Sequence, residues 1–146
     1  MQISSRFTVA LHIFACVDNF NGEYKITSDF LAVSINTNPV VIRNILAKLK
    51  RAGLIHVARG TGGVTPAKPL AEITFLDVYQ AIEPVENGEL FHFHEAPNPN
   101  CPVGRNIHRL LDDKLRIIQA AMENEMKKYS IADLCTGMRA LLAGEE

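Results

Sequence analysis

Two neighbouring polar side chains could read the edges of DNA bases. Arg43 and Asn44 lie on the outer face of a helix predicted over about residues 39–52. In the major groove a guanidinium can pair with guanine or hold a phosphate, and a carboxamide can pair with adenine. Val40 and Val41 could contact thymine methyl groups, although Val41 could equally face the core. The full set of candidate DNA-binding residues is Asn38, Val40, Val41, Arg43, Asn44, Lys48, Arg59 and Thr61.

The last two of these candidates belong to a glycine-rich turn, Arg59-Gly60-Thr61-Gly62-Gly63. It separates two short predicted strands, over 54–58 and 64–66, which would form a β-hairpin. At the hairpin tip Arg59 could enter a narrow minor groove, where negative potential is concentrated, and the glycines would let the backbone approach phosphates. By itself the turn could equally be an ordinary hairpin.

The charges are unevenly distributed along the chain. Residues 1–70 carry eight Lys/Arg and three Asp/Glu, whereas residues 71–146 carry seven and thirteen, so that +5 and −6 give the net charge of −1. A basic half favours a polyanion partner, because each phosphate contact releases counterions. A basic face that only contacts solvent is the alternative.

The elements that would position these side chains follow in a recognisable order. Hydrophobic spacing predicts helices over 4–19, about 27–33, 39–52 and 74–83, with the hairpin after the third. Pro39 fits a first helical turn, and Gly53 fits a helix end. The third helix directs Ile42, Ile45, Leu46 and Leu49 inward. Helix, tight turn, helix and hairpin is the order of a winged helix-turn-helix.

The second half predicts a helical appendage. An irregular segment, 84–104, precedes a long helix over about 105–129 and a last helix over about 131–142, which Ser130 caps. Hydrophobic residues recur along the long helix at spacings of three and four. This apolar stripe predicts a homodimer interface, with packing on residues 4–19 as the alternative. The interface candidates are Ile107, Leu110, Leu111, Leu115, Ile118 and Met122.

We therefore expect a mainly α fold with a small β-hairpin wing. It would comprise a winged helix-turn-helix DNA-binding domain (1–83), a flexible loop (84–104) and a helical dimerisation region (105–146). No hydrophobic run approaches the length of a membrane span, and the start does not resemble a signal peptide. We expect a cytoplasmic protein without membrane contact.

Three cysteines, Cys16, Cys101 and Cys135, are an odd number at wide spacings, with no CxxC pair. This pattern excludes a disulfide framework and a zinc finger. Cys101 directly precedes the long helix, where backbone N–H groups and the helix dipole stabilise a thiolate. It is therefore a candidate redox sensor, although an incidental thiol is the alternative.

Imidazoles and a thiol lie loosely clustered around the irregular segment. His92, His94, Glu95, Cys101 and His108 could offer zinc or copper ligands, but their spacing matches no closed zinc pattern. We predict no metal site. His12 and His56 are interpreted as structural.

Enzymatic function is not expected. The chain contains no phosphate-binding P-loop, dinucleotide fingerprint, nucleophile elbow or HExxH zinc motif. The remaining alternative is a winged-helix module that binds a protein instead of DNA.

Three segments resemble the Rrf2 family of winged-helix transcriptional regulators: 42–54, 59–63 and 73–78. The resemblance extends over nearly the whole chain, including 131–134, and segments 36–41 and 97–104 look closer to the cluster-free YwnA-like branch. It implies a dimer that pairs through the long helix and binds DNA with the second helix of the motif and the wing arginine. By position, contact roles fall on Asn38, Val40, Val41, Arg43, Asn44 and Arg59.

One departure from the family pattern concerns cofactors. Family members with an iron–sulfur cluster supply three cysteines from the loop before the long helix, whereas this chain has only Cys101 there. One thiolate cannot hold a cluster that needs three or four protein ligands. We expect no cofactor, and a homodimeric, sequence-specific DNA-binding regulator, acting as a repressor, that responds to a thiol or small-molecule signal.

Overall fold

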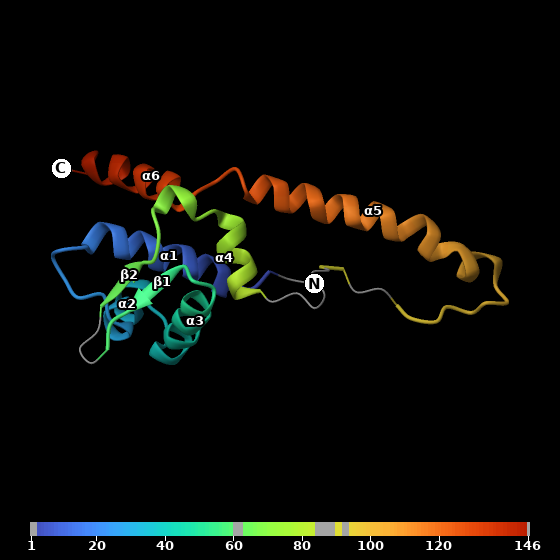
Figure 1. The fold of residues 1–146 in the computed structure, drawn as a ribbon, viewed down its shortest axis with the longest axis horizontal. Coiled ribbons are helices and arrows are strands. Elements are labelled where there is room, and N and C mark those ends of the chain that lie inside the picture. Colours follow the sequence, from blue (N-terminus) through green and yellow to red (C-terminus); the bar gives the residue numbers. More distant parts are fainter. Residues whose placement is uncertain (1–2, 60–62, 84–89, 92–93, 146) are drawn as a thin grey trace.

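The computed structural model describes residues 3–59, 63–83, 90–91 and 94–145. The described chain forms helices α1 (Ser5–Phe20), α2 (Ser28–Ile35), α3 (Pro39–Arg51), α4 (Phe75–Ile82), α5 (Pro102–Met126) and α6 (Ile131–Ala143). Strands β1 (Ile55–Val57) and β2 (Val64–Pro66) follow α3, and a single 3-10 turn, η1 (Leu70–Glu72), precedes α4. Figure 1 shows α1–α4, the hairpin and α6 gathered together, with α5 extending away from them. The expected mainly α fold with a small hairpin wing is confirmed.

Side-chain caps fix where the first helices begin. The Ser4 hydroxyl accepts a hydrogen bond from the backbone N–H of Arg6 (3.0 Å), and the Thr27 hydroxyl accepts one from Phe30 (3.1 Å). Helix α2 continues two residues past its predicted end. It stops at Asn36, whose left-handed backbone (φ 58°) lets its N–H bond the carbonyls of Ala32 and Val33. Asn tolerates this conformation better than most residues.

The helix-turn-helix closes over a hydrophobic core. As predicted, Ile42, Ile45, Leu46 and Leu49 are all buried on the inner side of α3. Gly53 ends the helix with φ +76°, the conformation that glycine adopts without steric cost. Phe14 and Ile13 of α1 and Leu31 of α2 are fully buried in the same cluster. Burial of these side chains therefore fixes the orientation of α3.

The hairpin is joined to the same core. Strands β1 and β2 pair antiparallel, with Ile55 opposite Pro66 and Val57 opposite Val64. Ile55 and Val64 are buried. The Val64 N–H also donates to the carbonyl of Ile26 (2.9 Å), in the segment that leads into α2. The base of the wing is thus held against the helix-turn-helix.

Helix α6 packs on the N-terminal part of the chain. Thr74–Asp77 and Ser130–Asp133 form two capping boxes, at the starts of α4 and α6. The two starts are bonded together, because the Ile131 N–H donates to the carbonyl of Ile73 (2.8 Å). Figure 1 shows α6 beside α1. Ile131 and Cys135 of α6 are buried in the same core as α1–α4. The expected dimerisation region (105–146) combined α5 and α6, but α6, unlike α5, contributes buried residues to this core.

Helix α5 begins three residues earlier than predicted. Pro102 occupies its first turn, where a missing N–H costs no hydrogen bond. None of the residues of α5 is buried.

Over the described part of the chain, no single helix is long and apolar enough to cross a membrane. Helices α2 and α3 would reach that length together, but they are bent by 116° at their junction.

Candidate nucleic-acid interface

Asn38 positions the start of α3. Its Oδ1 accepts a hydrogen bond from the Val40 N–H (2.7 Å), and Pro39 follows as the first helical residue. The carboxamide oxygen therefore caps the helix, and the amide nitrogen is the part of Asn38 that is left to contact a base or a phosphate.

The outer face of α3 brings three predicted residues together. Val40 is 55% exposed, and Arg43 and Asn44 are exposed as well. Because the opposite side of α3 is buried, these side chains point away from the core. Val41 is half-buried and packs against the core cluster. The N-terminal half of α3 thus presents a guanidinium, a carboxamide and a methyl-bearing side chain to the solvent, the groups that read base edges in the major groove.

Arg43 has an acidic neighbour on α2. Its Nη2 lies 3.9 Å from Asp29 Oδ1, and the two side chains are 59% and 82% exposed. Such a long, solvated ion pair contributes at most about 1 kcal/mol. The guanidinium can therefore exchange this carboxylate for a phosphate or a base.

Lys48 is placed differently from the other candidates. Its Nζ donates to the main-chain carbonyl of Ile82 (3.4 Å), the last residue of α4, and its side chain is half-buried. A cation at a helix C-terminus stabilises the carbonyl groups that have no partner within the helix. Lys50 and Arg51, which sequence reasoning left out of the contact set, are exposed in the last turn of α3. Both are basic and lie close to Lys48 in the sequence, and these two features could have identified them as candidate DNA contacts.

The hairpin wing carries the remaining two candidate residues. Arg59 follows β1 and is exposed. Thr61 lies outside the described residues. The Ala58 N–H donates to the carbonyl of Gly63 (3.1 Å), which continues the hairpin ladder beyond β1.

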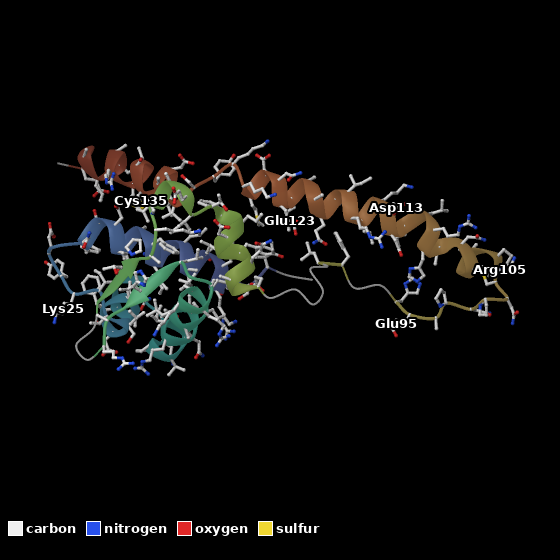
Figure 2. All side chains as sticks on the ribbon, viewed as in Figure 1. Lys25, Glu95, Arg105, Asp113, Glu123 and Cys135 are labelled. Carbon is white, nitrogen blue, oxygen red and sulfur yellow. The ribbon has the colours of Figure 1, made fainter. Side chains whose placement is uncertain are left out.

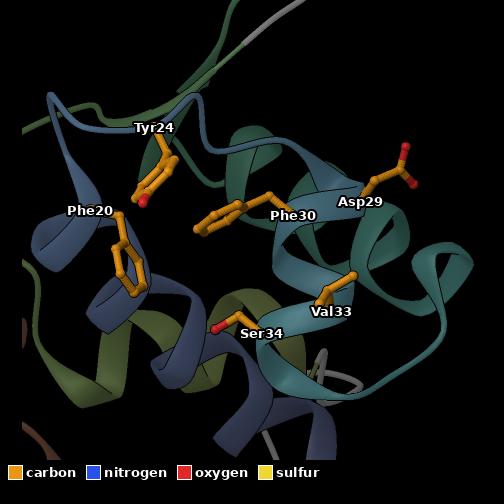
Figure 3. Close-up of a pocket in the computed structure, with 6 residues that line it drawn as sticks. All are labelled: Phe20, Tyr24, Asp29, Phe30, Val33 and Ser34. Carbon is orange, nitrogen blue, oxygen red and sulfur yellow. The ribbon is translucent and has the colours of Figure 1, made fainter.

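Three aromatic side chains pack together beside α2. Phe30 of α2 lies against Phe20 and Tyr24, with ring centroids 5.3 and 5.6 Å away. In Figure 3 these three rings lie close together, and Asp29 and Val33 of α2 line the same pocket. Aromatic pairs in such geometry add about 0.5–1.5 kcal/mol beyond their buried area. These ring contacts therefore help to fix the position of α2, the first helix of the helix-turn-helix.

The six predicted interface residues all lie on α5, with different exposures. Leu110 (64%) and Ile118 (54%) are exposed, whereas Ile107, Leu111, Leu115 and Met122 are partly buried. Sequence reasoning missed two further hydrophobic side chains at the edge of this stripe: Val103 is 69% exposed and Ile117 is 68% exposed. Their hydrophobic type and spacing were the signals: Val103 lies four residues before Ile107, although before the predicted helix start at about residue 105, and Ile117 lies seven residues after Leu110.

The segment before α5 is bonded to that helix. His108 contacts Asp112 Oδ1 through Nδ1 (3.0 Å) and the carbonyl of His94 through Nε2 (2.9 Å). The Leu90 N–H donates to Gln119 Oε1 (2.7 Å). Within the described residues, no three His, Cys, Asp or Glu side chains gather as they would around a metal ion. His92, a member of the loose cluster, lies outside the described residues.

The three cysteines occupy different environments. Cys101 is half-buried at the N-cap position of α5. Cys135 is buried next to Asp18, and burial raises the pKa of its thiol to about 11. Helix α5 has 25 residues, about 37 Å at 1.5 Å per residue. Figure 2 shows Arg105 at the far end of α5 and Cys135 beside the core, so the distance is too great for Cys101 and Cys135 of one chain to form a disulfide.

Comparison with known proteins agrees with this arrangement. The model of the Rrf2 family, described as iron-dependent transcriptional regulators, matches residues 3–137. The chain is 41% identical over 133 residues to YwnA of Bacillus subtilis (strain 168), assigned as an HTH-type transcriptional regulator, with 91% of this chain and 96% of YwnA covered.

Solved structures share both sequence and fold. A crystal structure of a protein assigned as DNA-binding is 35% identical, with a TM-score of 0.70 over 89% of this chain and 98% of that one. A Lactobacillus plantarum protein assigned as a transcriptional regulator is 26% identical, with a TM-score of 0.77 over 97% and 96%. An exposed face of polar and hydrophobic side chains on α3, a hairpin wing and these relatives lead to one conclusion: the chain belongs to the Rrf2 family of DNA-binding, winged-helix transcriptional regulators and is not an enzyme.

Proposed function

We propose that this regulator is a homodimeric, sequence-specific repressor that acts in the cytoplasm. The observation that carries the proposal is the division of α3 into a buried side and an exposed side with Val40, Arg43 and Asn44. In this proposal the N-terminal half of α3 enters the major groove, and Arg59 contacts the adjacent minor groove. Asn38, Val41 and Thr61 complete the proposed contact set, whereas Lys48, also predicted from the sequence as a contact, bonds the Ile82 carbonyl and positions α3.

Two copies would pair through α5. Leu110 and Ile118 leave hydrophobic surface exposed on a helix without a buried residue, and such a stripe is typical of a subunit interface. A two-fold symmetric dimer that pairs through α5 would present two reading helices and two wings to a pseudo-palindromic site.

Selection of bound DNA duplexes from a random pool tests both the proposed DNA binding and the proposed two-fold symmetry. We expect an enriched sequence with two related half-sites. Arg43→Ala should weaken binding and lower the slope of log K against log salt by about 1. Lys127→Ala, which removes an exposed positive charge after the end of α5, should bind like the wild type. Absence of duplex affinity at low salt would favour a protein-binding module instead.

Sedimentation analysis tests the dimer separately. Ile118→Glu should shift the protein from dimer to monomer, because it places a charge in the proposed seam. Ala120 is also exposed and lies about 200° around the helix from Ile118, so Ala120→Glu is the matched control. A monomeric wild type, or equal effects of both variants, would contradict the proposed interface.

Cys101 is the proposed redox element of the signal. Hydrogen peroxide would oxidise its thiolate to a sulfenic acid and release hydroxide, and a thiol of another copy would then displace water to form an intermolecular disulfide. We expect peroxide to change operator binding by the wild type but not by Cys101→Ser. An identical response from both proteins would remove this role.

Because only one cysteine lies in the segment before α5, we propose that the protein holds no iron–sulfur cluster.

A further inference from the structure

A cavity of about 200 Å³ opens between α1, α2 and α6, on a part of the molecule that the DNA-binding proposal does not use. Figure 1 shows α6 lying along α1 at this place. Its walls include His12 and Cys16 of α1, Ser34 of α2 and Met138 of α6. Three of these side chains carry a soft or borderline metal donor: an imidazole nitrogen, a thiol sulfur and a thioether sulfur.

The spacing within α1 brings two of these donors together. His12 and Cys16 are four residues apart in one helix, which places their Cβ atoms about 5–6 Å apart on the same face. Met138 belongs to the helix that packs against this face. None of the described residues that line the cavity is a carboxylate. Thiolate and thioether ligands select Cu(I), whereas carboxylate oxygens suit Mg²⁺, Ca²⁺ and Mn²⁺.

We propose that this cavity binds one Cu(I) ion through the His12 imidazole, the Cys16 thiolate and the Met138 thioether. On binding, the Cys16 thiol loses its proton to solvent and the sulfur forms a bond to copper. The copper stays in the +1 state, so no oxidant or reductant is needed.

Exposure of the three donors gives the ion a route into the cavity. Cys16 is only 4% exposed, whereas His12 is exposed and Met138 is half-buried. The unbranched methionine side chain has three rotatable bonds, and the exposed imidazole can turn inward. Both can therefore close on an ion at the fixed Cys16 sulfur while displacing water, of which a cavity of this size holds a few molecules.

The position of Ser34 ties the site to the helix-turn-helix. The Cys16 Sγ lies 3.3 Å from the Ser34 Oγ, and Ser34 belongs to α2, the first helix of the motif. Once Cys16 is a thiolate, the Ser34 hydroxyl can donate a hydrogen bond to it. The sequence analysis interpreted His12 as structural; in this proposal His12 is a ligand, and the third ligand, Met138, lies in the last helix.

Anaerobic titration of the untagged, reduced protein with Cu(I), in competition with a coloured Cu(I) chelator, tests the proposal. We expect one ion per chain and a thiolate-to-copper charge-transfer absorption. X-ray absorption should report one nitrogen and two sulfur neighbours. No binding by the wild type, or more sulfur neighbours than two, would overturn the proposal.

Variants assign the ligands one by one. Met138→Leu conserves volume and His12→Gln changes an exposed side chain, so both should fold even if Cys16→Ala does not. Each should weaken Cu(I) binding by at least about 10-fold, the lower limit for loss of even an outer-shell partner. Cys101→Ser, far away at the start of α5, is the matched thiol control and should bind like the wild type. Wild-type affinity in Met138→Leu or His12→Gln, or a loss in Cys101→Ser, would contradict this ligand set.

Discussion

The Lys48 ammonium lies 3.4 Å from the carbonyl oxygen of Ile82, and this bond joins α3, the second helix of the helix-turn-helix, to the end of α4. Lys48 is therefore a positioning residue as well as a basic residue of α3. Its hydrogen bond holds α3 from behind while Arg43 and Asn44 remain exposed in front.

Lys48→Met should lower the free energy of unfolding by about 1 kcal/mol, since it removes one hydrogen bond between a charged group and a partly buried carbonyl. The salt dependence of DNA binding should stay close to the wild-type slope. Denaturant unfolding and binding at several salt concentrations measure the two effects. Arg43→Ala is the comparison variant: it should lower the salt slope of DNA binding and leave the free energy of unfolding close to the wild-type value. If Lys48→Met also lowered the salt slope by about 1, Lys48 would contact a phosphate directly.

Asp29→Asn should strengthen DNA binding, because the negative charge 3.9 Å from Arg43 competes with phosphates for the guanidinium. Stability should fall by at most about 1 kcal/mol, the range of an exposed pair and of a charge at a helix start. Asp113→Asn is the matched control, since Asp113 pairs with Arg116 on α5 at 3.1 Å and both are exposed. Fluorescence anisotropy on the selected operator measures the affinity; weaker binding by Asp29→Asn would refute this account.

Gly104→Ala should release the segment before α5. A Cβ at Gly104 would lie 2.6 Å from the carbonyl oxygen of Asn98, so the backbone must shift. Hydrogen exchange over residues 94–101 should become faster. Gly137 in α6 has no atom near an added Cβ, so Gly137→Ala should instead stabilise the protein by about 1 kcal/mol through helix propensity. Unchanged exchange in Gly104→Ala would mean that the contact imposes no constraint.

Stability should decline in alkaline solution, in part because of Cys135. Its pKa is raised in the folded state from 9.0 to about 11, chiefly by burial and then by the charge of Asp18. A raised folded pKa means that the contribution is fully present below pH 9 and is lost as pH rises towards 11. Lysines and tyrosines titrate in the same range in every variant, so the comparison with Cys135→Ala isolates the thiol. That variant should show a smaller alkaline loss in denaturant unfolding; an equal loss would rule out Cys135 as a cause.

The sequence alone determined most of the local elements and which side of α3 is exposed. Ser130 was readable as a cap because a cap bonds a backbone N–H only two or three residues away, here that of Asp133. The hydrophobic period of α3 fixed which of its residues are buried, and so which side holds Arg43 and Asn44. This information is contained within a few helical turns.

Only the tertiary structure decided how distant segments meet. No local pattern indicates that Lys48 bonds Ile82, that Cys135 and Ile131 complete the core of α1–α4, or that Met138 shares a cavity with Cys16. Each of these contacts depends on the packing of whole helices, because side chains far apart in sequence are brought together by burial of a common hydrophobic core rather than by short-range hydrogen bonds.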